Sequence, residues 1–193
     1  MKNNRLTPEE ITQAAKELNV QEAWIKAFLE KEVKSAKKEA FCKDGIRPTI
    51  LFERHIFHRL TGGIYSKKYP DISNSKPGGY GKYSEQHNRI GKAAILNRDA
   101  ALMSASWGGF QIMGENWKYL GYKSLQAFIN DMYESEYKQL MAFVKFIKVR
   151  GIDKYMRAGD FQTVSRLYNG PNYKKNNYDT DLKKYFLSFG GKI

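Results

Sequence analysis

The stretch Ala105-Ser106-Trp107-Gly108-Gly109-Phe110-Gln111-Ile112-Met113-Gly114 lies near the middle of the chain and combines glycines with a single glutamine. Its glycines can let a bound polymer approach the backbone, and the Gln111 carboxamide can hold hydroxyl or acetamido groups. Further along, Arg166-Leu167-Tyr168-Asn169-Gly170-Pro171 offers Tyr168 and Asn169 for stacking on a sugar and hydrogen bonding to it. Taken alone, each stretch is equally compatible with a helix cap and a packed aromatic ring.

Helical periodicity dominates the sequence on both sides of this stretch. Thr7, Pro8 and Glu10 form a helix start in which Thr7 is the N-cap. Apolar spacing and capping residues predict helices over residues 7–18, 23–29, 90–103, 107–113, 124–148, 160–168 and 179–189. Residues 49–52 form either a short strand or the start of a buried helix. Residues 62–83 are rich in Gly, Ser, Asn, Pro and Tyr, which predicts a long functional loop.

Length and composition indicate one mainly helical domain. A chain of 193 residues can bury roughly 70% of the surface that it exposes when unfolded. Apolar residues make up 41% of it and aromatic residues 14%, which argues against disorder. No segment is long enough to act as a linker, so we expect a single domain over residues 1–193, mostly α with a small β element near its middle.

The charge indicates what the surface binds. A formal net charge of +13 favours a polyanionic partner such as nucleic acid, teichoic acid, lipopolysaccharide or an anionic membrane. No apolar run approaches the roughly 18–20 residues that span a bilayer. The basic N-terminus is not followed by an apolar run of about 7–15 residues, so no secretory signal peptide is expected. Because Cys42 is the single cysteine, no intramolecular disulfide forms and a reducing compartment is expected.

The sequence does not point to a metal, an activated cysteine or a phosphate loop. His55 and His58 are spaced i, i+3, and His87 is the other histidine, without the ligand spacing of a zinc site. Nothing local activates the thiol of Cys42. Gly78-Gly79-Tyr80-Gly81 lacks the strand and the Lys-Ser or Lys-Thr of a phosphate loop. We therefore expect no metal and no cofactor, and the absence of nucleic-acid-binding signatures predicts no specific nucleic-acid partner.

Two glutamates are candidates for acid–base chemistry on a glycosidic bond, which needs a carboxyl held in a dry place that raises its pKa. Glu32 ends the apolar stripe of the second helix, where the negative end of the helix dipole favours the neutral acid. Glu53 lies between Leu51-Phe52 and Ile56-Phe57 and is expected to be partly buried. Each also has a structural explanation, Glu32 as a solvated helix end beside Glu30 and Glu53 as the partner of an arginine.

Longer stretches carry a resemblance to a known family. They are Arg47-Pro48, Ile50-Leu51-Phe52-Glu53-Arg54-His55-Ile56-Phe57, Tyr69-Pro70-Asp71-Ile72-Ser73, Gly78-Gly79-Tyr80-Gly81, Ser104-Ala105-Ser106-Trp107-Gly108, Phe110-Gln111-Ile112-Met113-Gly114 and Tyr168-Asn169-Gly170-Pro171 with Tyr173. Together they resemble the lysozyme-like superfamily of goose-type lysozymes and soluble lytic transglycosylases, and more closely the N-acetylmuramidase family of phage endolysins. The resemblance extends from about Leu18 to Phe186. It implies a mainly α, α+β lysozyme-like fold with a small β element beside a substrate cleft.

The resemblance also assigns roles to residues. In that family the catalytic Glu closes the early helix in a pattern like Val-Glu-Ser, which carries the acid over to Glu32. The small residues expected after it are replaced here by residues 33–38, so Glu30 and Glu53 remain alternatives for the acid. Glu53 is otherwise expected to orient the attacking water or to hold the cleft through an arginine. The saccharide is expected to be bound by Gln111, Tyr168 and Asn169.

The implied function is that of an endolysin, a glycoside hydrolase that cuts the β-1,4 bond between N-acetylmuramic acid and N-acetylglucosamine for host lysis. A lytic transglycosylase that leaves 1,6-anhydro ends, a chitinase and a wall-binding protein without activity are the alternatives. We expect a monomer whose partners are the peptidoglycan glycan strand and an anionic envelope surface, lipopolysaccharide or phospholipid. We also expect synthesis in the host cytoplasm and action in the periplasm after holin-type release.

Overall fold

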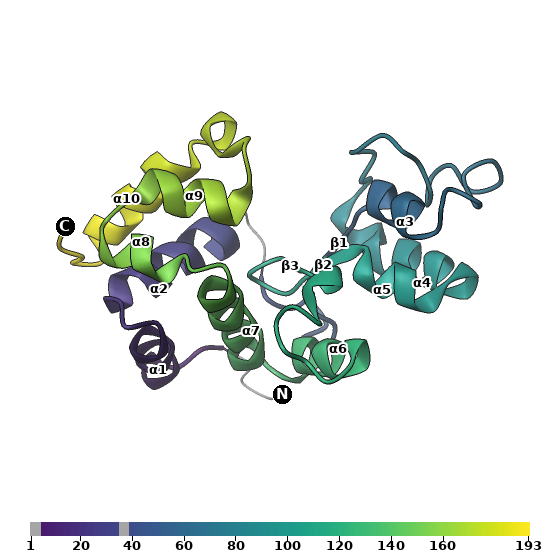
Figure 1. The fold of residues 1–193 in the computed structure, drawn as a ribbon. Coiled ribbons are helices and arrows are strands. Elements are labelled where there is room, and N and C mark those ends of the chain that lie inside the picture. The colour runs from purple at the N-terminus through teal and green to yellow at the C-terminus, as the bar shows by residue number, and fades with distance from the viewer. Residues whose placement is uncertain (1–4, 35–38) are drawn as a thin grey trace.

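The computed structural model in Figure 1 describes residues 5–34 and 39–193. Residues 35–38, within the replaced segment 33–38, lie outside the described residues. The helices are α1 (Pro8–Leu18), α2 (Glu22–Leu29), α3 (Arg54–Leu60), α4 (Gln86–Leu96), α5 (Arg98–Met103), α6 (Leu125–Glu134), α7 (Glu136–Val149), α8 (Asp153–Arg157), α9 (Phe161–Asn169) and α10 (Tyr178–Ser188). The strands are β1 (Ile50–Phe52), β2 (Ala105–Trp107) and β3 (Ile112–Met113). A π-helical turn, Glu30–Lys34, continues α2.

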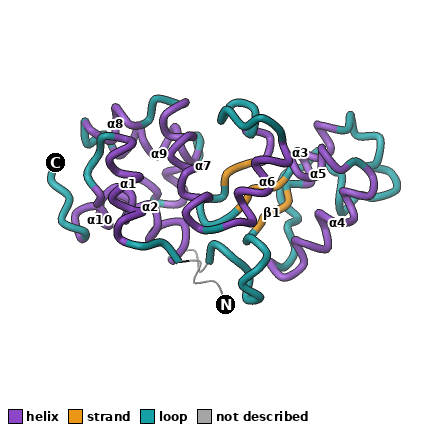
Figure 2. Tube along the Cα trace, turned by 90° about the horizontal axis from the view of Figure 1, so that it is seen from below, coloured by secondary structure: helices purple, strands orange, loops and turns teal. Residues whose placement is uncertain are grey.

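The helices form two groups on either side of a small sheet (Figures 1 and 2). One group holds α1, α2 and α7 to α10, and the other holds α3 to α6. The sheet between them is antiparallel in the order β1-β2-β3, with Phe52 opposite Ala105 and Trp107 opposite Ile112. This arrangement confirms the predicted mainly α fold with a small β element.

The first group is organised around α2, in which Ala23, Trp24, Ile25, Ala27 and Phe28 are buried and Glu22 and Lys26 form the polar side. Trp24 stacks on Phe161 with ring centroids 4.5 Å apart, and Phe28 meets Phe143 edge to face at 5.0 Å. Both Trp24 and Phe28 are fully buried. These contacts fix the helix that leads into Glu32.

Among the described residues, no helix is long and apolar enough to cross a membrane.

Several helices lie where the sequence predicts them. Helix α1 begins with the expected capping box, in which Glu10 N donates to Thr7 Oγ1 and Thr7 N donates to the Glu10 carboxylate. Asp160 caps α9 by accepting from Thr163 N at 2.9 Å. The alternative left open at residues 49–52 is resolved as a strand, β1.

Two predicted helices are wrong as single elements, because a capping residue breaks each of them. Asn97 has an extended backbone (φ −157°, ψ 104°) and its side chain accepts from Ala100 N, so residues 90–103 divide into α4 and α5. Ser135 (φ −165°, ψ 162°) caps α7 through Lys138 N and separates it from α6. Short polar side chains compete with the helix for backbone N–H groups, and here they restart it in a new direction.

The predicted helix over residues 107–113 is also wrong. This segment is the β2–β3 hairpin, in which Trp107 and Ile112 are paired across a tight turn. Gly108 and Gln111 have φ of +71° and +50°, in the left-handed region that a right-handed helix excludes. The stretch around Gln111 therefore supplies a hairpin between the two helix groups.

Candidate active site

Glu32 is held by the C-terminal part of the chain. Its carboxylate accepts a hydrogen bond from the hydroxyl of Tyr178, the first residue of α10, which is 3% exposed. Lys31, from the same π-helical turn, pairs with Asp181 of α10 at 2.6 Å. These contacts fix the orientation of the carboxyl group at the end of α2.

Tyr168 continues this contact toward the hairpin. Its ring centroid lies 6.0 Å from that of Tyr178, and its hydroxyl donates to the Phe110 carbonyl at 2.8 Å. Burial, together with the negative charge of Glu32, raises the pKa of Tyr168 and of Tyr178 well above the ordinary tyrosine value. The Tyr168 hydroxyl therefore stays protonated and holds the hairpin beside the Glu32 turn.

The side chain of Gln111 forms hydrogen bonds within the β2–β3 hairpin. Ser106 Oγ donates to Gln111 Oε1 at 2.9 Å, and Gln111 Nε2 donates to the Gly108 carbonyl at 2.8 Å. A side chain at Gly108 would collide with the buried carboxamide of Gln139, whose oxygen also accepts from Gly109 N at 2.8 Å. The interpretation that Gly108 makes room for a polymer is therefore wrong, because α7 fills that space.

Glu53 directly follows β1 and caps α3 with its backbone. Its N–H donates to the Ser104 carbonyl at 2.8 Å, and its side chain is 16% exposed, with Oε2 3.2 Å from His55 Nδ1. Burial raises the pKa of Glu53, while the charge of His55 and a polar contact with Tyr80 oppose the rise. The arginine partner expected for Glu53 is thus replaced by His55 and Tyr80.

The loop that carries Tyr80 is anchored to α4. Arg89 donates at 2.7 Å to the carbonyls of Gly79, Tyr80 and Asp71. These contacts hold the predicted functional loop over the start of α3.

Gln86, which is buried, adds a second anchor. Its Nε2 donates to the Tyr80 carbonyl at 2.6 Å and its Oε1 accepts from Phe52 N at 2.9 Å, so the loop is connected to β1. The sequence alone does not indicate these roles of Tyr178, Tyr80, Arg89 and Gln86. Their signal was faint, since each lies in a segment without periodicity or at a helix start.

The hairpin connects the predicted site residues. On one side Tyr168 joins it to the Glu32 turn. On the other side Ser106 Oγ, which donates to Gln111, lies 3.5 Å from the Leu51 carbonyl, two residues before Glu53. Asn169, the last residue of α9, is exposed.

Two other candidates have structural roles. Burial raises the pKa of the Cys42 thiol, which donates to the Pro48 carbonyl at 3.7 Å, so this thiol is not activated. His58 Nδ1 lies 2.7 Å from Ser66 Oγ and so connects α3 to the loop that follows it. Within residues 5–34 and 39–193, no three His, Cys, Asp or Glu side chains gather as a metal site would require.

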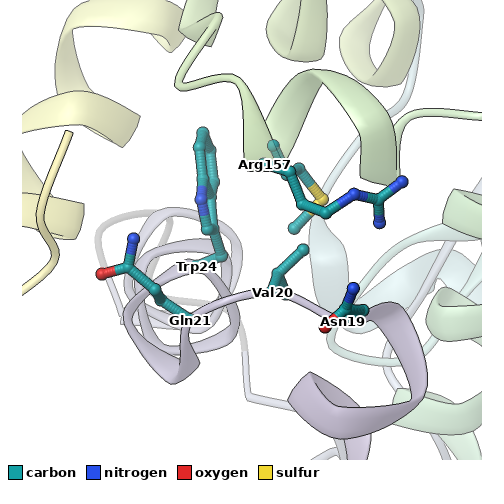
Figure 3. A pocket seen from close by; sticks show the side chains of 6 residues that line it. Asn19, Val20, Gln21, Trp24 and Arg157 are labelled. Carbon is teal, nitrogen blue, oxygen red and sulfur yellow. The ribbon is translucent and has the colours of Figure 1, made fainter.

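A separate surface pocket of about 300 Å³ lies where α1, α2 and α8 meet, with Trp24 and Arg157 on opposite sides (Figure 3). Arg157 donates to the Leu18 carbonyl at 2.9 Å and pairs with Asp153, so its guanidinium ties α8 to α1. None of the five predicted site residues lines this pocket.

Comparison with known proteins identifies the family. Residues 21–190 match the N-acetylmuramidase family. The crystal structure of the Burkholderia AP3 phage endolysin superposes with a TM-score of 0.89 at 37% sequence identity, over 98% of this chain and 73% of that one. No curated protein sequence matches the chain. The chain therefore belongs to the N-acetylmuramidase family, and it is a glycoside hydrolase that degrades peptidoglycan.

Proposed function

We propose that this muramidase is a phage endolysin that hydrolyses the β-1,4 bond between N-acetylmuramic acid and N-acetylglucosamine, with Glu32 as its general acid. The observation that carries the proposal is the Glu32 carboxylate, held by a buried tyrosine hydroxyl at a turn that Tyr168 joins to the hairpin. A general acid must be oriented before the substrate arrives, and this contact orients it.

The proton moves from the Glu32 carboxyl to the glycosidic oxygen. The bond between that oxygen and the anomeric carbon then breaks, and the muramic acid ring takes on oxocarbenium character. A bound glycan strand excludes water from the carboxyl group and so favours its neutral, proton-donating form. General acid catalysis of this kind supplies about 10²–10⁴-fold in rate.

Glu53 completes the hydrolysis in this proposal. It accepts a proton from the water that attacks the anomeric carbon. A carboxylate whose pKa is raised by burial is a stronger base than a solvated one, and the pKa of Glu53 is raised in this way. Its Oε2 lies 3.2 Å from His55 Nδ1, and its charge contributes to the raised pKa of Tyr80.

The predicted saccharide-binding residues divide into two kinds. Asn169 is exposed and can bond a sugar directly. Gln111 and Tyr168 already bond the hairpin, so we assign them the task of fixing its backbone beside the glycan. The retained alternative acid, Glu30, lies in the same turn as Glu32.

The proposal extends to the cell envelope. The net charge of +13 supports binding of the monomeric protein to lipopolysaccharide or phospholipid headgroups. In this proposal the protein is made in the host cytoplasm, reaches the periplasm through a holin-type pore and then binds the anionic envelope surface. No specific nucleic-acid partner and no cofactor are proposed.

The test is digestion of purified Gram-negative peptidoglycan, followed by liquid chromatography and mass spectrometry of the products. Wild type is expected to release disaccharide units with reducible muramic acid ends, and Glu32→Gln to lower the rate by about 10²–10⁴-fold. Glu30→Gln and Glu53→Gln are measured in parallel. Glu134→Gln is the matched control, because Glu134 is exposed on α6 and its substitution changes the charge equally.

The outcomes separate the alternatives. If a folded Glu32→Gln protein digests peptidoglycan at the wild-type rate, Glu32 is not the general acid. If only Glu30→Gln loses the activity, Glu30 is the general acid. Products one water lighter, with 1,6-anhydro ends, would identify a lytic transglycosylase and remove the role of Glu53 as a base.

A further inference from the structure

Arg54, which directly follows Glu53, has a guanidinium that makes no hydrogen bond or ion pair with any residue that the structure describes, and its Nε is buried without a partner. Arg47, Arg59 and Arg157, in contrast, each pair with a carboxylate, as Arg59 does with Glu115 at 2.5 Å. A buried donor without an acceptor is unfavourable and calls for an explanation.

The packing of Gly79 shows which part of this guanidinium is available. A Cβ at Gly79 would lie 2.5 Å from Arg54 Cζ and 2.6 and 2.8 Å from its two terminal nitrogens. Because the carbon is the nearest atom, the Gly79 backbone lies over the flat face of the group. The N–H donors lie in the plane of a guanidinium, so they point sideways from this contact and can meet a planar acceptor.

The surrounding charges favour an anion beside Arg54. Arg89 lies close enough for the charge of Arg54 to contribute to lowering its pKa, although burial is the larger cause. The hydrogen bonds of the Arg89 guanidinium go to backbone carbonyls. The carboxylates of Asp71 and Glu85 favour its charged form but form no ion pair with it. Glu53 is engaged with His55, so none of these carboxylates pairs with Arg54.

We propose that Arg54 binds a carboxylate of the peptide stem on the N-acetylmuramic acid residue, and so selects glycan that carries stems. The inference rests on the proposed function, since the stem is attached to the sugar whose bond is cut. Arg54 directly follows Glu53 in the chain and lies against the Gly79 backbone, next to Tyr80, so it is close to the proposed base. A guanidinium edge and a carboxylate form two parallel charge-assisted hydrogen bonds.

The experiment measures KM and kcat on glycan fragments of equal length. One carries peptide stems, and in the other the stems are removed by an amidase and the lactyl carboxylates that this exposes are converted to amides. Wild type is expected to show a KM about tenfold lower on the fragment with stems, as two charge-assisted hydrogen bonds allow. Arg54→Gln brings the ratio of the two KM values close to one, and Arg54→Lys keeps part of the difference. An unchanged ratio in Arg54→Gln would overturn the proposal.

Two further measurements keep the test decisive. Arg59→Gln is the matched control, because it removes an equal charge from α3 at a guanidinium that already pairs with Glu115, and it is expected to leave the ratio unchanged. A third fragment, whose stem carboxylates are converted to amides, tests the proposal with the wild-type enzyme alone. Wild type must treat it like the stem-free fragment, and equal KM values for the amidated and native stems would refute the role of Arg54.

Failure of the proposed function gives a different result. The products would then carry 1,6-anhydro ends, or Glu32→Gln would cleave as wild type does, or wild type would cleave none of the fragments. Calorimetric binding of the same fragments to wild type would still decide the role of Arg54, since tighter binding of the native stems supports it and equal binding refutes it.

Discussion

The hydroxyl of Tyr178 donates a hydrogen bond to the carboxylate of Glu32, a residue 146 positions earlier in the chain. Tyr178 is buried at the start of α10, and its pKa is raised by this burial and by the negative charge of Glu32. The orientation of the proposed acid therefore depends on the last helix as well as on the helix that carries it.

Replacement of Tyr178 by Phe is expected to lower kcat about tenfold with little change in KM, because the lost hydrogen bond to a charged group orients the acid and not the sugar. Steady-state kinetics on soluble peptidoglycan fragments measure both constants. Tyr185→Phe, on the same helix, is the control, since no hydrogen bond from the Tyr185 hydroxyl to a described residue is present. Equal losses in both variants, or a change confined to KM, would contradict the positioning role.

Tyr168 and Tyr178 also predict how stability depends on pH. Their pKa values in the folded protein are raised, so the folded state keeps protons that the unfolded chain loses near pH 10. The stabilisation is fully present below pH 10 and is lost as the pH rises above it. Urea unfolding between pH 8 and 11 is expected to show this decline. The slope should be shallower in Tyr168→Phe, and an identical slope would contradict the linkage.

The sequence predicts best those helices whose ends carry their own caps. Thr7 with Glu10 and Asp160 with Thr163 form local contacts within four residues, which the sequence shows directly. Asn97 caps in the same way, but the apolar stripe continues across it and hides the break. Whether such a residue breaks a helix depends on how the two halves pack on the rest of the protein.

The β2–β3 hairpin was mistaken for a helix for a related reason. Its paired segments, Ala105–Trp107 and Ile112–Met113, are too short for alternation to show. The left-handed backbone of Gln111 is accompanied by hydrogen bonds of its side chain with Ser106 and Gly108, and no periodic pattern in the sequence marks such contacts.

The sequence predicts the two carboxylates of the proposed site but not the tyrosines that contact them. Glu32 and Glu53 stand out beside apolar segments and within recognisable motifs. Tyr178 and Tyr80 do not, because each meets its glutamate through contacts distant in sequence, and nothing in the local pattern marks a tyrosine for such a contact.

Gly108→Ala is expected to destabilise the hairpin beyond the cost of backbone strain. A methyl group there collides with the Gln139 carboxamide and adds to the roughly 1–2 kcal/mol that a left-handed residue with a Cβ costs. Gly121→Ala is the matched control, because Gly121 has a similar φ of +76° with open space around its Cβ position. Denaturant unfolding compares the two. Equal losses of unfolding free energy would show that the contact with Gln139 does not restrict this position.

Glu53→Gln is expected to stabilise the protein at neutral pH while it lowers activity. Burial raises the pKa of Glu53, so the folded protein binds the proton more tightly than the unfolded chain does. Stability from this group is therefore fully present below pH 4.5, the ordinary value, and is lost as the pH rises through the raised pKa. Removal of the charge should raise the melting temperature at pH 7, and the gain should vanish below about pH 4.

Glu136 provides the comparison that separates the two effects. Burial raises its pKa as well, and its carboxylate accepts from Leu6 N at 3.2 Å, a bond that the Gln oxygen can keep. Glu136→Gln is therefore expected to reproduce the thermal gain at pH 7 and to leave peptidoglycan cleavage unchanged. If Glu53→Gln also cleaves at the wild-type rate, the buried carboxylate of Glu53 serves the fold and not the reaction. If neither variant gains stability at pH 7, the two carboxylates are solvated more fully than their packing indicates.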